Sequence, residues 1–349
     1  MNPTAHAVII ILGTAALGAL RAEEPRRAPP YEPLPAGVER LTTFGERADW
    51  SSDGRRIIFL EKTFGDVFEF ELATKALRPL THHYFHEGYT RALHLADGDI
   101  LLSGASKFDA GKPWKSRNET AELWILEKPF ESPPVRLGTK CSEGPAVSRS
   151  HMRIAWTIDH GDYPSRLPEG VSQMWAADII KEGGGKEGGP PRLAHERLIL
   201  DSRDLPFRCN LETQDFRPPD EKELIFSAYG YQGTEVMGVS LETGKVINYS
   251  SAPGQYDEPE GVFPDGRHTL VECDKHCLKG SGHVDLYRLA LDGTGVTERL
   301  TFFSDREPYK ASNPVVSPDG ARIAFQEARS NEPAGVGHGI LVLTLEKKP

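Results

Sequence analysis

The stretch Asn313-Pro-Val-Val-Ser-Pro-Asp-Gly-Ala-Arg-Ile-Ala-Phe-Gln326 predicts two short strands joined by a tight turn. Its first half contains two adjacent β-branched valines, and an apolar run resumes after the turn. In Ser317-Pro-Asp-Gly320, proline presets φ and glycine supplies a positive φ, as a tight turn requires. The same order of strand, turn and strand recurs at residues 49–59 and 261–271, so an internal repeat decides the fold.

Six copies of this hairpin can be set in register by the residue at the turn: Asp53, Asp97, Ser150, Asp220, Asp265 and Asp319. Successive turns lie 44 to 70 residues apart, the size of a four-stranded propeller blade with its loops. A third apolar strand follows each hairpin, and several copies continue into a fourth strand that ends in Arg-Leu or Pro-Leu. This order predicts an all-β, six-bladed β-propeller over residues 37–349. Two packed β-sandwiches are the alternative, but they would not explain a fixed order repeated six times.

The two ends of the chain predict how the ring closes. The sixth copy has only three strands, whereas Val38-Glu-Arg-Leu-Thr42 carries the fourth-strand ending before the first hairpin. We therefore expect this N-terminal strand to complete the last blade, which removes the free edges that an open sheet would expose.

Composition limits the classes of function. The 349 residues are 38% hydrophobic, enough for a full core, and carry a net charge of −10 with a pI near 5.7. This acidic balance argues against a nucleic-acid-binding protein, because phosphate contacts need a basic surface. We expect a monomer.

The N-terminal segment indicates export. Residues 5–20 are apolar, and Arg21-Ala22 and a charged segment follow, which predicts a signal peptide over residues 1–22. The alternative is an uncleaved anchor, although the apolar run is short for a membrane span. Residues 23–36, rich in proline and charge, are expected to form a flexible tether. We predict a periplasmic or extracellular protein whose mature chain has no membrane span.

Export makes two disulfides plausible on sequence grounds. Cys273 lies close to Cys277, which leaves Cys141 and Cys209 to pair with each other across the entry loops of adjacent blades. Four free thiols are one alternative. A Cys/His metal site around His276 is another.

The hairpins resemble a known repeat. Trp50-Ser-Ser-Asp-Gly-Arg-Arg-Ile-Ile-Phe59 and Val316-Ser-Pro-Asp-Gly-Ala-Arg-Ile-Ala-Phe325 are similar to the PD40, or WD40-like, repeats of TolB-type propellers. The resemblance implies a blade and no catalytic residue. Related propellers serve as periplasmic protein-interaction modules, as gating domains of serine peptidases and as oligogalacturonate lyases. A peptidase is not expected, because the sequence has no Gly-x-Ser-x-Gly elbow.

The register predicts a ligand-binding ring. In a propeller, the loops that enter the innermost strands and those that join the second and third strands gather around the axial channel. The side chains expected around this funnel are Arg47, Arg91, Glu143, Gln214, Glu258, Asn313, Tyr229 and Tyr231. Polar and aromatic loops at residues 159–163, 227–234 and 255–260 lie on the same face, and Asp257 or Glu258 with Glu143 would suit acid/base chemistry. The alternatives are inter-blade salt bridges and solvated loop acids.

The entry to the second blade is rich in histidine. His82, His83 and His86 are candidate ligands for a divalent metal, and no other cofactor is expected. Histidines of other loops on this face could complete such a site: His160, His276, His283 and His338. The alternative is that these histidines only hydrogen-bond to the backbone.

These observations favour a non-catalytic binding module for a protein or carbohydrate ligand at the axial funnel. The alternative is a lyase or hydrolase that resembles oligogalacturonate lyases and acts on an anionic sugar. In that case Arg47 and Arg91 would neutralise the sugar carboxylate, and a histidine of the His82 to His86 loop would take the proton.

Overall fold

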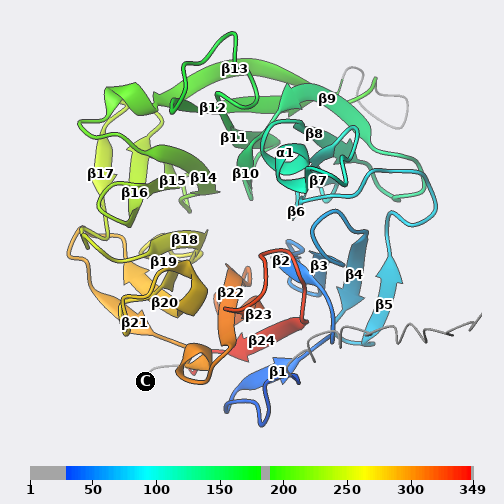
Figure 1. Ribbon diagram of the computed structural model, residues 1–349. Coiled ribbons are helices and arrows are strands. Elements are labelled where there is room, and N and C mark those ends of the chain that lie inside the picture. The colour runs from blue at the N-terminus through cyan, green and yellow to red at the C-terminus, as the bar shows by residue number, and fades with distance from the viewer. Residues whose placement is uncertain (1–28, 182–188, 347–349) are drawn as a thin grey trace, which may run out of the picture.

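The chain folds into a ring of six four-stranded antiparallel sheets around a central axis (Figure 1). The computed structural model describes residues 29–181 and 189–346. Within them there is one α-helix, α1 (Pro113–Asn118), besides three short 3₁₀ turns. The predicted all-β, six-bladed propeller is therefore confirmed. No helix of the described residues is both long enough and apolar enough to cross a membrane.

Each of the first five blades uses four consecutive strands, ordered from the axis outward. The first contains β2 (Glu46–Trp50), β3 (Arg56–Leu60), β4 (Val67–Glu71) and β5 (Ala76–Pro79). The second contains β6 (Arg91–His94), β7 (Ile100–Ala105), β8 (Ala121–Leu126) and β9 (Val135–Lys140). The third contains β10 (Glu143–Val147), β11 (Arg153–Asp159), β12 (Ser172–Ile180) and β13 (Arg192–Asp201). The fourth contains β14 (Asn210–Phe216), β15 (Glu223–Tyr229), β16 (Thr234–Ser240) and β17 (Val246–Asn248). The fifth contains β18 (Asp257–Val262), β19 (His268–Cys273), β20 (Asp285–Ala290) and β21 (Thr297–Arg299).

The sixth blade joins the two ends of the described chain. It contains β22 (Tyr309–Val316), β23 (Arg322–Arg329) and β24 (Ile340–Thr344), and β1 (Val38–Arg40) is its outermost strand. β1 runs antiparallel to β24, with Val38 opposite Leu343 and Arg40 opposite Leu341. The first described strand thus covers the edge that β24 would otherwise expose.

The repeated turn has a simple physical basis. In the sixth blade, the Ser317 backbone N–H donates to the Arg322 carbonyl (2.8 Å), and the Asp319 side chain accepts from the Ala321 N–H (3.0 Å). Gly320 has a φ of +69°, a conformation that costs other residues more. The turn closes the hairpin between the first and second strands, on the face opposite the loops that enter each blade.

The innermost strands carry bulges at the position of the predicted ring. In five of the six blades the pairing of the first and second strands shifts there, and only β6 pairs with β7 without a shift. Arg47, Gly144 and Asn313 each adopt a positive φ at this position, at 53°, 50° and 47°. The bulges turn the strand beside the axis and re-aim its side chains.

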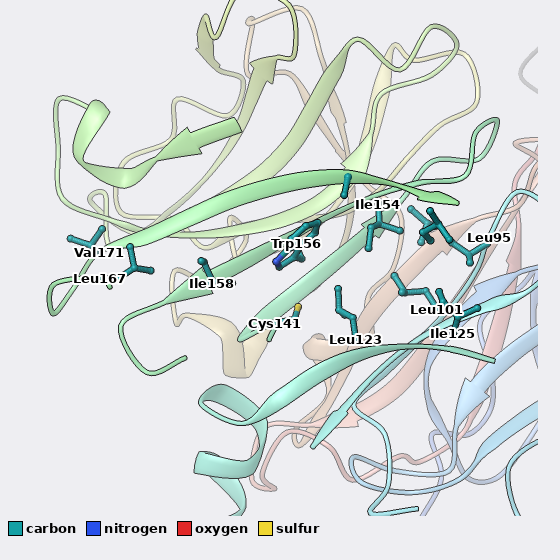
Figure 2. Packing of buried hydrophobic residues seen from close by; sticks show 13 residues of the cluster. Leu95, Leu101, Leu123, Ile125, Cys141, Ile154, Trp156, Ile158, Leu167 and Val171 are labelled. Carbon is teal, nitrogen blue, oxygen red and sulfur yellow. The ribbon is translucent and has the colours of Figure 1, made fainter. Parts of the chain in front are cut away.

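The hydrophobic core lies between neighbouring blades. One cluster joins the facing surfaces of the second and third blades, with Leu123 and Ile125 on one side and Ile154 and Trp156 on the other (Figure 2). These side chains are almost fully removed from water, and each contributes roughly 1.5–3 kcal/mol of transfer free energy. Blade-to-blade packing of this kind fixes the positions of the innermost strands around the axis.

The cysteines correct the disulfide prediction. All four lie in the described residues, and none forms a disulfide. Cys141 packs in the cluster between the second and third blades (Figure 2), whereas Cys209 packs in the cluster between the third and fourth. The sheet of the third blade separates them. Cys273 is buried, while the Cys277 thiol is directed to the His283 carbonyl oxygen (3.5 Å).

The predicted signal peptide, residues 1–22, and the first part of the predicted tether lie outside the described residues. The described remainder, residues 29–36, is packed against the sixth blade rather than held as a flexible tether. The Tyr31 ring contacts those of Phe303 and Tyr309, with centroids 4.5 and 5.0 Å apart, and the Pro29 carbonyl accepts a hydrogen bond from the Tyr309 hydroxyl (2.8 Å). Aromatic packing therefore fixes this part of the segment.

Candidate functional site

A cavity of about 410 Å³ opens at the axis, on the face formed by the loops that enter the innermost strands. Five of the predicted ring residues line it: Arg47, Arg91, Tyr229, Glu258 and Asn313. We call this cavity the funnel. Below it the axis narrows to a waist of about 40 Å³, where Gln214 lies.

Tyr231 is placed away from the funnel. Tyr231 stacks on Phe207, with ring centroids 3.5 Å apart, and packs at the margin of the core between the third and fourth blades. Glu143 begins β10, and its side chain lies outside what the structure describes.

The funnel floor is built around the hydroxyl of Tyr229. This hydroxyl contacts Glu212 Oε2 at 2.7 Å and also contacts Oε1 of Glu258. The Tyr256 hydroxyl contacts the other carboxylate oxygen of Glu258, Oε2. A phenol has one proton to donate, so it can donate to only one of its two carboxylate neighbours. The other contact requires a proton on the carboxyl group. The Tyr229 hydroxyl can therefore bridge Glu212 and Glu258 when one of these two carboxyl groups is protonated.

Burial and like charges favour this protonated state. Burial, followed by the nearby charge of Glu272, raises the pKa of Glu258, although the two tyrosine hydroxyls oppose that shift. The pKa of Tyr229 is also raised, by burial and by the charges of Glu212 and Glu258. Tyr229 therefore stays a neutral hydrogen-bonding group.

A second pair of acids faces the sixth blade. Glu272 accepts hydrogen bonds from the Ser312 hydroxyl (2.7 Å) and the Asn313 backbone N–H (2.5 Å). Glu260 accepts from the Asn313 side-chain amide (3.0 Å). Burial, followed by the charge of Glu258, raises the pKa of Glu260 well above its usual value. Asn313 thus links two carboxyl groups of the fifth blade to the axis.

Cationic groups are interleaved with these acids. Arg91 lies 3.4 Å from Glu212, an ion pair that crosses the axis between the second and fourth blades. Arg47 also lines the cavity, and its backbone N–H donates to the Gln326 side chain (2.8 Å). Arg91 therefore makes an inter-blade salt bridge, which was the predicted alternative, and it also lines the funnel. Lys310 and Arg117 add positive charge to the lining.

Several lining residues were missed by the sequence reasoning: Glu212, Glu272, Gln326 and Arg329. Tyr256 and Glu260 belong to the polar loop at residues 255–260 but were not placed in the ring. Glu260 is the extra residue of the bulge in β18, between Pro259 and Gly261, and this bulge is set by pairing across the sheet. Glu272 comes from a second strand, opposite Glu258 in the register, which a count along first strands does not reach.

The three histidines of the loop make hydrogen-bond contacts, whereas the composition of the loop had predicted metal ligands. His82 and His86 are both directed to Asp66, at 3.2 and 2.8 Å, whereas His83 Nε2 contacts the Glu131 carbonyl oxygen at 3.1 Å. The four histidines named to complete the site each contact a different partner, among them Leu167 for His160 and Glu332 for His338. The loop therefore brings together two of its three histidines.

Another cluster, His276, Asp285 and Asp305, has ligand atoms close enough to hold a cation. Arg299 already lies between its two carboxylates, 2.7 Å from Asp285 and 2.6 Å from Asp305. The guanidinium supplies the positive charge that this cluster needs, so it is an internal ion pair.

The fold and the funnel define a six-bladed propeller with a polar cavity on its axis. No family model and no curated protein sequence matches the chain. Among solved structures it is similar to a gluconolactonase from Xanthomonas campestris, with 14% identity, coverage of 88% of this chain and 89% of that one, and a TM-score of 0.53. It is also similar to an oligogalacturonate lyase in complex with manganese, with 14% identity, coverage of 89% and 93%, and a TM-score of 0.50. For TolB from Acinetobacter baumannii the values are 16% identity, 85% and 67% coverage, and a TM-score of 0.46.

At these identities the similarities show the fold alone. The six-bladed propeller architecture predicted from the repeats is confirmed by the six sheets themselves.

Proposed function

We propose that this chain is an exported binding module that takes a carbohydrate in the axial funnel. The observation that carries the proposal is the convergence of hydrogen-bond donors and acceptors from five blades on one cavity of about 410 Å³. This volume falls within the usual range for small-molecule sites. Arginine and amide groups can donate to sugar hydroxyls, and carboxylates can accept from them.

The composition of the lining favours a small polar ligand over an apolar one. Glu212 and Glu272 are buried, and Tyr229 and Tyr256 present hydroxyls that already contact Glu258. A ligand that replaces these contacts must offer several hydroxyls or amides at once, because buried polar groups left without partners cost roughly 1–3 kcal/mol each. Polyhydroxylated sugars meet this requirement. A polar side chain of a protein partner is the other ligand that the funnel would fit.

The enzymatic alternative rests on the raised pKa of Glu258 beside other carboxyl groups. A protonated acid next to an ionised one is what carbohydrate-cleaving enzymes use for acid/base chemistry. Two of the similar structures, the gluconolactonase and the oligogalacturonate lyase, are named for sugar chemistry. In this alternative Arg47 and Arg91 would hold the carboxylate of an anionic sugar. A divalent metal on the same face would have Asp66 and His82 as candidate donors.

The binding proposal can be tested with an array of neutral and uronic oligosaccharides, followed by isothermal titration of the hits. Asn313→Asp keeps the size of the side chain, and aspartate also tolerates a positive φ. The substitution replaces the side-chain amide donor with a negative charge. We expect it to weaken sugar binding at least tenfold. Asn248→Asp is the matched control, because Asn248 lies on the outermost strand β17 and its side-chain oxygen accepts a hydrogen bond from the Ser251 N–H (2.9 Å), as a carboxylate also can.

Equal binding by the two variants would place the sugar elsewhere, and an array without hits would favour a protein ligand. Appearance of a conjugated double bond during incubation with a uronic oligomer would favour the lyase instead. Export itself is tested by N-terminal sequencing of the secreted protein, which should begin after Ala22.

A further inference from the structure

A second cavity, of about 320 Å³, lies at the opposite end of the axis. Six residues in equivalent positions of the repeat, each directly before the turn residue, surround it: Ser52, Ala96, Arg149, Pro219, Pro264 and Pro318. Trp50, Val262 and Val316 add apolar walls. We call this cavity the turn-face cavity. The waist of about 40 Å³ separates it from the funnel and has room for only a few water molecules.

Charged groups gather on the floor of the turn-face cavity, where it meets the waist that Asp49 lines, and most of them satisfy one another. Asp49 is fully buried and accepts two hydrogen bonds from the Arg149 guanidinium (2.8 and 3.2 Å). It also accepts from the His94 backbone N–H (2.7 Å). Glu221 accepts from the backbone N–H groups of Arg149 (2.9 Å) and Ser150 (3.2 Å). Neither carboxylate needs a further partner.

Asp215 is the exception on this floor. Its Oδ2 atom accepts one hydrogen bond, from the Val262 N–H (3.0 Å). Within the described residues, no hydrogen bond is made to its other oxygen, although the residue lines both the turn-face cavity and the waist. A carboxyl group held between apolar walls with an unused acceptor is what a bound donor would complete.

We propose that the turn-face cavity binds a small amphipathic amine, with its apolar body between Trp50 and Val316 and its ammonium group on Asp215. The sign of the charge follows from the floor. Three carboxyl groups, Asp49, Asp215 and Glu221, face Arg149 and the imidazole of His94, and Arg149 is already engaged by Asp49. An anionic ligand would meet this excess of acid, whereas an ammonium group reduces it. The proposal does not depend on the function of the funnel.

The titration of Asp215 gives the binding a pH dependence. Burial raises the pKa of Asp215 to about 6; Asp49 and Glu221 add to the rise, while Arg149 and the Val262 N–H oppose it. Below this pKa the carboxyl group is neutral, so an amine must displace its proton in order to pair with it. Affinity for the amine therefore rises as the pH rises through about 6 and then levels off.

The experiment is a calorimetric titration of the full chain with benzylamine, benzyl alcohol and benzoate at pH 7.5 and pH 5. These probes share one ring and differ in the charge of the head group. Benzylamine should saturate one site at pH 7.5 and bind about tenfold more weakly at pH 5, because roughly a tenth of a group with a pKa near 6 is ionised there. Benzyl alcohol should bind weakly and benzoate should not bind. Benzoate binding as tight as benzylamine binding would overturn the proposal.

Three variants locate the site. Asp215→Asn should weaken benzylamine binding at least tenfold at pH 7.5 and abolish its pH dependence. Val316→Phe fills the cavity and leaves Asp215 in place, so it should also abolish binding and provides a second test if Asp215→Asn does not fold. The matched control is Asp265→Asn, an exposed acid in the turn of the fifth blade, which should bind as the unmodified chain does. Unchanged binding by Val316→Phe, or loss of binding in Glu258→Gln instead, would show that the amine does not occupy this cavity.

Discussion

The two ends of the propeller axis are built from the same strands and yet present opposite chemistry. The funnel is lined by charged and polar side chains that hydrogen-bond to one another, whereas the turn-face cavity has apolar walls and a few charges on its floor. The difference follows from the repeat. The turns deliver a small residue or a proline to one end of the axis in five of the six blades, and Arg149 in the third. The loops at the other end differ from blade to blade, and they carry residues such as Tyr256 that occur once.

The comparison also separates two ways of holding a carboxyl group away from water. At the turn face, Asp49 is ionised and paired with a cation. In the funnel, burial and the charge of Glu272 raise the pKa of Glu258, whose carboxyl group contacts two tyrosine hydroxyls. The first arrangement fixes the scaffold, and the second leaves a group that can change its partner when a ligand enters.

The largest effect should come from breaking the charge pair at the turn face. Asp49→Ala leaves Arg149 and His94 without the buried carboxylate, so we expect a loss of about 3 kcal/mol in the free energy of unfolding at pH 7. Burial would raise the pKa of Asp49, but Arg149 and His94 outweigh it and bring the pKa to about 2. The stability that this group contributes is present above its unfolded pKa of about 3.8 and is lost as the pH falls through about 2.

Urea denaturation at several pH values measures this effect. Asp265→Asn breaks the exposed pair with Arg267 (2.9 Å) on the same face and should change stability by less than about 0.5 kcal/mol. Equal effects of the two substitutions would mean that Asp49 is not a buried partner.

A smaller effect is expected at the funnel floor. Tyr229→Phe removes the hydroxyl between Glu212 and Glu258, which leaves two buried carboxyl groups facing each other, and should cost about 2 kcal/mol at pH 7. Tyr231→Phe is the control in the same loop, because that ring stacks on Phe207 through its face. It should change the free energy of unfolding by less than about 0.5 kcal/mol. If Tyr229→Phe and Tyr231→Phe lower the free energy of unfolding equally, the Tyr229 hydroxyl does not hold the floor together.

The two ends should also respond differently to pH. The pKa of Asp215 is raised from 3.8 to about 6, so the stability that it contributes is complete below about pH 3.8 and is lost as the pH rises through about 6. Asp215→Asn removes this loss. The free energy of unfolding of the variant should therefore rise relative to that of the unmodified chain between pH 4 and 6, and the difference should stay constant at higher pH. The pKa of Glu260 is raised well above its ordinary value, so the relative gain of Glu260→Gln in the free energy of unfolding should begin above about pH 4.5.

Denaturation across this pH range compares the two variants with the unmodified chain, and the differences cancel the other titrating groups. If the gain in the free energy of unfolding is the same at every pH, neither Asp215 nor Glu260 titrates with the raised pKa that its surroundings predict.

The fold could be predicted from the sequence because the turn imposes its own register. Counting back from Asp53 and Asp319 placed Arg47 and Asn313 at the axis, where the structure has them. The same count missed Glu260, since β18 pairs through Pro259 and resumes at Gly261, so the extra residue lies one position further on. A bulge of this kind depends on pairing across the sheet, which a count along one strand does not see.

Other features depended on three-dimensional packing. Cys141 and Cys209 lie in entry loops of adjacent blades, and only the structure shows that the third sheet lies between them. The turn-face cavity was also missed. Pro264 and Pro318 were interpreted as turn residues alone, but the ring of six turns places them around the axis.

The smallest effects are expected at the histidine loop of the funnel face, where they decide between a metal and hydrogen bonding. His86 uses both ring nitrogens, since Nε2 contacts Asp66 at 2.8 Å and Nδ1 accepts from the Gly88 N–H at 2.9 Å. Neither nitrogen has a lone pair left for a metal ion in this arrangement. His86→Ala should therefore cost about 1 kcal/mol through the lost hydrogen bonds and the lost stacking on Tyr89. His82→Ala should cost less than about 0.5 kcal/mol, because that side chain is 78% exposed.

Thermal melting with added manganese, and again with a chelator, completes this test. We expect the melting temperature of the unmodified chain to stay unchanged in both, because a bound metal would first have to displace Asp66 or Gly88 from His86. A rise with manganese that is lost in His86→Ala would contradict this arrangement and support the metal-dependent alternative. A rise that survives in His86→Ala would place the ion elsewhere, and its loss in Glu258→Gln would then locate it at the funnel floor.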